Sequence, residues 1–356
     1  MRFINFRKET SERSDVSNWA KKILVENTRF YFDAIEGCNE NSQNIVTHFM
    51  ERARVDVSEG QSSVQDVLTS IVNLEGSDVL QRKINFAKSF HLPLTYILYC
   101  DEKEFVWIFT IKSLTECEYS TSFDSYKAFS DWIASIKGWK STKPFRERTD
   151  LPYFDKILRK SGCAWPTNID CFISNQSFEP IAILEFQNAK NTEVLKHCNN
   201  EFFLGKLVHF NQYGYPVYDN DIRRWQSQEI LRVQSGLRLF IITWAQNSDD
   251  FILKEVEVIS FPLLPFSQNW NLHSEYQKLM HDYANSHDVE LAKKIMFKFT
   301  TYKLKYCPPN MLQEFHQPPL STKDKSFPCI YYRYKNKVVG RKKDLPNLLS
   351  QLIEHN

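Results

Sequence analysis

The chain has 356 residues, of which 42% are hydrophobic and 25% charged, a composition typical of a folded protein. Its net charge of +2 means that any attraction to nucleic acid must come from local clusters of basic residues. The apolar runs are shorter than the roughly 20 residues that span a bilayer, so no transmembrane helix is expected. The charged N-terminus and eight cysteines without a CxxC pair predict a cytoplasmic protein with reduced, mostly buried thiols.

The first part of the chain predicts an N-terminal α/β domain over residues 1–140. Residues 16–54 are expected to be mostly helical. The next segments predict a strand at 67–76 and a helix at 79–90. A hairpin is expected from 92–100 and 104–112, because two apolar runs flank a polar turn. A helix at 125–139 ends this domain, and the polar segment that follows is expected to be a linker.

A second domain is predicted over residues 141–265, followed by a C-terminal helical and basic lobe over 266–356. The second domain should contain, in order, a helix, two strands, helices and two further strands, which favours a mixed central sheet flanked by helices. The predicted elements are a helix at 151–162, strands at 168–175 and 180–187, a helix at 221–236, and strands at 237–245 and 249–259.

The two α/β segments share the plan of helix end, buried strand, acidic turn and second strand. Two interpretations stay open: either the halves are related, or this common motif arose twice. If they are related, Glu75 would lie where residues 185–187 lie in the second half, and the first domain would be a degenerate copy.

Two carboxylates in the second domain have a chemical reason for their spacing. Asp170 lies within a predicted strand and Glu185 ends the next one, with fourteen residues between them. Gln187 points to the same face as Glu185, because side chains alternate along a strand. Hydrolysis of a phosphodiester needs a hard divalent cation, and carboxylates on neighbouring strands are its usual ligands.

These residues, in PTNIDCFI followed by IAILEFQNAKN, resemble the motif of the PD-(D/E)XK nuclease superfamily, the fold of many restriction endonucleases. The resemblance covers roughly residues 150–244 and implies a restriction-endonuclease-like core that binds Mg²⁺ or Mn²⁺ through Asp170 and Glu185. Gln187 stands where the family most often has lysine, and a neutral amide lacks the lysine's positive charge. Lys190 or Lys196 downstream could replace that charge.

The family also places an acid on the preceding helix, for which Asp155 fits best, ahead of Glu147 and Asp150. The alternative is structural: Asp170 would pair with Arg159 or Lys160, and Asp155 would be a solvated helix charge.

Basic residues near the C-terminus alternate with tyrosines, which favours contact with nucleic acid, although such clusters are also common on solvated surfaces. The candidates for nucleic-acid binding are Arg223, Arg224, Lys335, Lys337, Arg341, Lys342 and Lys343.

The resemblance therefore implies a metal-dependent DNA endonuclease of restriction or phage-defence type. It would act as a homodimer if it cuts both strands, and a defence-system partner protein would fit this setting. The alternative is a nuclease-like module that binds nucleic acid or assembles with other proteins, with its acids engaged in salt bridges.

Overall fold

The computed structural model describes residues 1–9, 18–141, 150–189, 194, 202–203, 207–210, 216–218, 221–260, 263–265, 326–328 and 330–354. Its contacts divide the chain into two compact units. Unit 1 comprises Met1–Val25 and Arg29–Ile183, and unit 2 comprises Glu26–Thr28 and Leu184–Asn356. The predicted boundaries near residues 140 and 265 remain predictions from composition.

Unit 1 is a mixed α/β structure whose strands run in the order β6-β5-β4-β3-β2-β7, with β1 also paired to β3. The β3–β4 pair is parallel, whereas β1–β3, β2–β3, β2–β7, β4–β5 and β5–β6 are antiparallel. The strands are β1 (Arg2–Arg7), β2 (Tyr31–Glu40), β3 (Val46–Ser58), β4 (Leu94–Cys100), β5 (Phe105–Ser113), β6 (Glu116–Phe123), β7 (Thr167–Ser174) and β8 (Pro180–Asn188), the last of which continues into unit 2.

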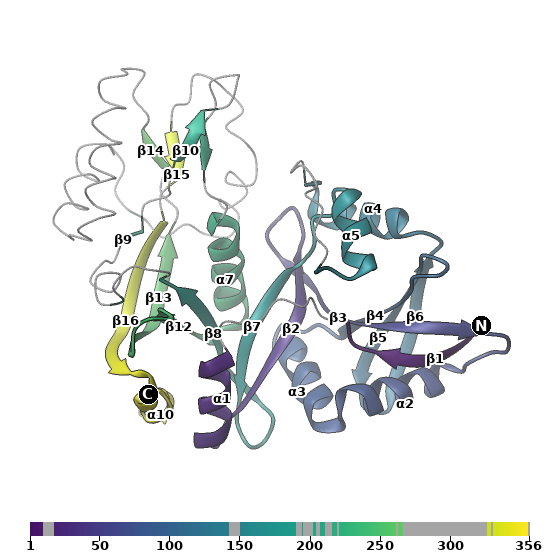
Figure 1. The fold of residues 1–356 in the computed structure, drawn as a ribbon, viewed down its shortest axis with the longest axis horizontal. Coiled ribbons are helices and arrows are strands. Elements are labelled where there is room, and N and C mark those ends of the chain that lie inside the picture. Colours follow the sequence, from purple (N-terminus) through teal and green to yellow (C-terminus); the bar gives the residue numbers. More distant parts are fainter. Residues whose placement is uncertain are drawn as a thin grey trace. The chain divides into compact units, whose positions relative to one another are not determined.

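Helices cover both faces of this sheet, with α2 and α3 on one side and α4 and α5 on the other (Figure 1). All seven residues of β4 are buried, as expected for a strand with both faces covered. A cluster that includes Met50, Tyr99 and Phe154 forms the core beneath α4 and α5. The helices are α1 (Asn18–Asn27), α2 (Val64–Glu75), α3 (Ser77–Lys88), α4 (Tyr126–Lys137) and α5 (Tyr153–Lys160).

Strand β3 is long enough to hold two partners along one edge. Its first part, Val46–Met50, pairs with β2, and its last part, Arg54–Ser58, pairs with β1. The short stretch between them is therefore where the chain leaving β1 meets β2. Lys8 follows β1 at this point.

In unit 2 the strands run in the order β8-β12-β13-β16-β9, and β10–β11 and β14–β15 form separate pairs. Residues 239–242 and 251–253 are buried and form much of the described core. The elements are β9 (Phe202–Phe203), β10 (Leu207–Phe210), β11 (Pro216–Tyr218), α7 (Asp221–Ser235), β12 (Arg238–Trp244), β13 (Asp250–Ser260), β14 (Leu263–Pro265), β15 (Ser326–Pro328), β16 (Ile330–Arg341), η2 (Lys342–Asp344) and α10 (Leu345–Glu354).

Two sequence-based expectations in the first half are wrong. Residues 16–54 are not mostly helical, because α1 ends at Asn27 and the hairpin of β2 and β3 follows. Residues 67–76 form most of helix α2 instead of a strand. Ser63 and Asp66 form a capping box that starts this helix. Two of its β-branched residues, Val67 and Ile71, are buried on one face of the helix. Local capping here outweighs strand propensity.

The remaining expected strands and helices agree with the structure wherever it describes them. The hairpin of β4 and β5, helices α3, α4 and α5, strands β7 and β8, and the series α7-β12-β13 are all present. Four described cysteines, Cys38, Cys100, Cys163 and Cys171, are free and buried, as expected. No helix in the described part of the chain is long and apolar enough to cross a membrane.

Candidate functional site

Glu185 is a buried acid held by helix α7. It lies on β8 and is only 1% exposed. The Gln228 Nε2 atom donates a hydrogen bond to Glu185 Oε2 at 2.7 Å, and Arg224 forms an ion pair with the other carboxylate oxygen. Arg224 and Gln228 are four residues apart, so both project from the same face of α7. A buried charge without such partners would be costly.

The two residues after Glu185 are also held in place. The Arg224 guanidinium donates to the Phe186 carbonyl at 3.2 Å, and the Thr243 hydroxyl donates to Gln187 Oε1 at 2.9 Å. Strand β12 thus fixes the amide of Gln187. Arg224 places a cation next to the triplet instead, and its side chain is 41% exposed.

The other two predicted acids, Asp170 and Asp155, belong to unit 1. Asp170 lies on β7 with intermediate exposure and accepts a hydrogen bond from Asn168 Nδ2 at 2.6 Å. Asp155 lies on α5 and binds the Arg52 guanidinium through both oxygens, at 2.6 and 3.1 Å. Asp155 therefore forms a bidentate ion pair with Arg52. Lys190 and the side chain of Arg223 lie outside the described residues.

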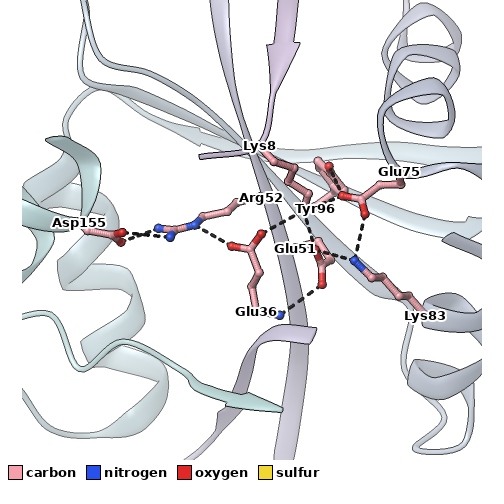
Figure 2. Close-up of polar contacts among 8 residues, drawn as sticks. All are labelled: Lys8, Glu36, Glu51, Arg52, Glu75, Lys83, Tyr96 and Asp155. Carbon is pink, nitrogen blue, oxygen red and sulfur yellow. Dashed lines mark hydrogen bonds and ion pairs between the residues drawn. The ribbon is translucent and has the colours of Figure 1, made fainter. Parts of the chain in front are cut away.

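Unit 1 contains a buried ion network, shown in Figure 2, which the sequence did not point to. Lys8 lies at its centre and contacts three carboxylates: Glu36 at 3.0 Å, Glu51 at 2.7 Å and Glu75 at 2.6 Å. Burial alone would lower the pKa of Lys8, but these carboxylates outweigh it and keep the pKa raised. The members of the network are Lys8, Glu36, Glu51, Arg52, Glu75, Lys83, Tyr96 and Asp155.

A second lysine, Lys83 of α3, contacts Glu51 and Glu75 at 2.9 Å each. Burial would lower the pKa of Lys83, yet the two carboxylates raise it overall. The Tyr96 hydroxyl donates to Glu75 at 2.7 Å. Glu51 is only 1% exposed, and both ammonium groups contact the same carboxylate oxygen, Oε2.

The network extends towards α5 through Arg52. The Arg52 Nε atom donates to Glu36 at 2.7 Å, while its two terminal nitrogens bind Asp155. The backbone N–H of Glu36 donates to Glu51 at 3.2 Å, which ties β2 to β3. Each acid of this network is therefore bound by at least one cation of the first unit.

One feature of the sequence could have revealed the centre of this network. Glu36 and Glu51 are separated by fourteen residues, the same number that separates Asp170 from Glu185. Glu75, expected where residues 185–187 lie if the two halves are related, ends helix α2 instead of lying on a strand.

The stability of the network should depend on pH through Glu75. Burial would raise its pKa, but Lys83 and Lys8 lower it from 4.5 to about 2. A carboxyl with a depressed pKa stabilises the fold above its unfolded pKa, and this contribution is lost as pH falls from about 4.5 towards 2. In Glu75→Gln, acidification over this window should cost about 2 kcal/mol less than in the unsubstituted protein, as measured by urea unfolding at pH 6 and pH 3. Identical pH slopes would contradict the role given to Glu75.

Strand β16 presents an exposed row of basic side chains in unit 2. Lys335, Lys337 and Arg341 are exposed and occupy alternating positions, which share one face of a strand. Lys343 is exposed just beyond the strand. Lys342 faces the fold instead: it donates to the Ala245 carbonyl at 3.0 Å and lies 5.6 Å from the centre of the Trp244 ring.

Among the described residues, no group of three histidine, cysteine or acidic side chains is arranged to hold a metal ion. No protein-family model, curated protein or solved structure matches the chain. The case for function therefore rests on the residues themselves.

Proposed function

We propose that the protein is a metal-dependent nuclease of the PD-(D/E)XK type that hydrolyses phosphodiester bonds of DNA. The observation that carries the proposal is the pairing of Glu185 with Arg224 beside Gln187. A glutamine cannot provide the positive charge that lysine lends to the reaction, and Arg224 brings such a charge to the same triplet from helix α7.

The chemistry of the donors fits a hard divalent cation. Asp170 and Glu185 both offer carboxylate oxygens, the ligands that Mg²⁺ and Mn²⁺ prefer. When bound, the cation would polarise the phosphate and lower the pKa of a water molecule. Gln228 holds one oxygen of Glu185 in a fixed direction, and Thr243 orients the Gln187 amide. Asp155 is the less direct candidate, because Arg52 already binds both of its oxygens.

The guanidinium of Arg224 is proposed to stabilise the charge that develops on the phosphate. Its partial exposure would allow it to reach the phosphate once a cation has taken its place on Glu185. The exposed row on β16, Lys335, Lys337 and Arg341, would bind the DNA backbone without reading its sequence. A role in restriction or phage defence, with a partner protein, follows from the family resemblance and belongs to the same proposal.

Replacing Arg224 tests the proposal. Arg224→Gln should lower the cleavage rate at saturating DNA on the order of a hundredfold, because one charge-stabilising donor is lost. Binding of DNA should change little, as measured by a gel shift in Ca²⁺. Arg341→Gln, on the exposed strand face, is the matched control and should weaken binding without lowering the saturated rate. Equal effects of the two substitutions on the saturated rate would contradict the role of Arg224.

A second function is favoured by one specific observation: the carboxylate of Glu185 is already bound by Arg224 and Gln228. An acid saturated in this way would suit a nuclease-like module that binds nucleic acid and does not cut it. DNA binding without cleavage in Mg²⁺ or Mn²⁺ would identify this second function.

A further inference from the structure

The chain contains the same structural unit twice. The order α1-β2-β3 in the first half matches α5-β7-β8 in the second, and the turn between the two strands recurs 134 residues later. Strand β2 ends at Glu40 and β7 ends at Ser174, 134 positions later; β3 begins at Val46 and β8 at Pro180, again 134 later. No insertion or deletion is needed across these three elements.

Burial follows the same correspondence. Leu24 and Leu158 are both buried on the helices that open the two copies, at 0% and 2% exposure. Ile35 and Ile169 are both 1% exposed on the following strands. The plan then continues in parallel: α2 and α3 lead into β4-β5-β6-α4 in the first copy, and α7 leads into β12-β13-β16-α10 in the second, which also has β9, β10 and β11 before α7 and β14 and β15 between β13 and β16.

The corresponding acids follow from this alignment. Glu36 occupies the position of Asp170, and Glu51 occupies the position of Glu185. Glu51 and Glu185 are each 1% exposed. The candidate acids of the second copy therefore have counterparts in the first.

Strands β2 and β7, which correspond to each other, pair antiparallel about a local two-fold axis. Ile35 lies opposite Ile169, its own counterpart. Asp33 lies opposite Phe172, and Cys38 lies opposite Thr167. At the 134-residue separation, Asp33 corresponds to Thr167 and Cys38 corresponds to Phe172. A two-fold rotation that exchanges the copies therefore turns the Asp33–Phe172 pair into the Cys38–Thr167 pair. Such self-complementary pairing is the mark of a two-fold dimer interface.

A helix of the second copy also completes the core of the first. Phe154 of α5 stacks on Tyr99 of β4 with ring centroids 4.2 Å apart, and it packs edge-to-face with Tyr126 with ring centroids 4.7 Å apart. Arg52 of the first copy and Asp155 of the second form a bidentate ion pair. Exchange of an element between identical protomers is a common route to a dimer.

The two copies differ at their acids. In the first, Lys8 and Lys83 both contact Glu51 Oε2, and their side chains are only 28% and 9% exposed. In the second, the only cation that the described residues place on Glu185 is Arg224, whose side chain is 41% exposed. A ligand can therefore reach the cation of the second copy more readily than those of the first.

We propose that the chain is a fused dimer of two nuclease-like copies that works as a monomer, with cleavage confined to the second copy. The surface by which a single copy would dimerise is already filled by the β2–β7 pairing, so the homodimer expected from the sequence is not required. The second part of this inference rests on the proposed function: with one cutting copy, each binding event should nick one strand of a duplex.

Two measurements on the full-length protein test the inference. Light scattering after gel filtration should give the mass of one chain, 42.2 kDa, for the free protein, and the mass of one chain plus one duplex when a short DNA duplex is added. A supercoiled plasmid in Mg²⁺ should accumulate as the nicked circle, with specific activity independent of protein concentration.

The possible outcomes distinguish the fused dimer from the proposed nuclease activity. A dimer mass at micromolar concentration would overturn the fused dimer, whatever the cleavage result. Linear plasmid formed without a nicked intermediate would overturn the single cutting copy and still support a nuclease. A monomer that cleaves nothing in Mg²⁺ or Mn²⁺ would support the fused dimer and remove both the nicking and the proposed function.

Discussion

Lys83→Met should lower the free energy of unfolding by about 3–5 kcal/mol, because breaking a buried ion pair leaves charge without a partner. Lys83 is 7% exposed and lies between Glu51 and Glu75, at 2.9 Å from each. Methionine keeps most of the side-chain volume but removes the ammonium. Lys8 would then be the only lysine left to neutralise both acids. Urea unfolding followed by circular dichroism measures the loss.

The matched control is Lys112→Met, which removes a lysine from an exposed pair of contacts with Glu116 and Glu118. Exposed ion pairs contribute about 0–1 kcal/mol, so this variant should change stability little. Adding Glu75→Gln to Lys83→Met should recover part of the loss, since it removes one of the two acids left short of partners. A loss below about 1 kcal/mol in Lys83→Met would show that the network does not hold the first copy together.

Glu185→Gln should lower DNA cleavage by at least on the order of a thousandfold, since a metal-ion contribution of several kcal/mol corresponds to this change in rate. Glutamine preserves the shape of the side chain but removes the charge that would bind the cation. A gel shift in Ca²⁺ should show DNA binding within a few-fold of that of the unsubstituted protein. Asp170→Asn should behave in the same way.

The corresponding substitution in the first copy, Glu51→Gln, is the sharpest control. It changes the same residue type at the equivalent, equally buried position. We expect it to lower stability, because Lys8 and Lys83 each lose a partner, and to leave the cleavage rate of the folded protein unchanged. Loss of cleavage in both variants would show that both copies take part. Loss in Glu51→Gln alone would place the activity in the first copy.

Much of the local structure could be predicted from the sequence. Strands β4 and β5 are uninterrupted apolar runs around a polar turn, and α5 has a clear apolar stripe closed by Gly162, whose φ is +72°. The strand that carries Glu185 is equally plain. Patterns of this kind depend on neighbours a few residues away, which the sequence displays directly.

The first hairpin escaped prediction for a physical reason. Its strand β2 contains a glycine and several charged or small residues, which are poor strand formers. The strand is stabilised by pairing with β3 and with β7, and β7 begins more than a hundred residues later. A pattern within a few neighbouring residues cannot indicate a pairing with a strand so distant in the sequence.

The partners of the candidate acids were also out of reach of sequence reasoning. Gln228 lies 43 residues after Glu185 and contacts it only because α7 packs on the sheet. Lys8 lies 43 residues before Glu51 and reaches it where β1 and β2 meet along β3. The regular fourteen-residue spacing of the two acid pairs was the one signal available in the sequence.

Incubation of the full-length protein with supercoiled plasmid over a series of Mg²⁺ concentrations tests the central claim most directly, with Glu185→Gln and a chelator as parallel samples. We predict nicked circles that increase with Mg²⁺ or Mn²⁺, and intact plasmid in the chelator and with Glu185→Gln. Plasmid that stays intact at every concentration of either cation, while a gel shift shows that the protein binds it, would contradict a nuclease and indicate a binding module.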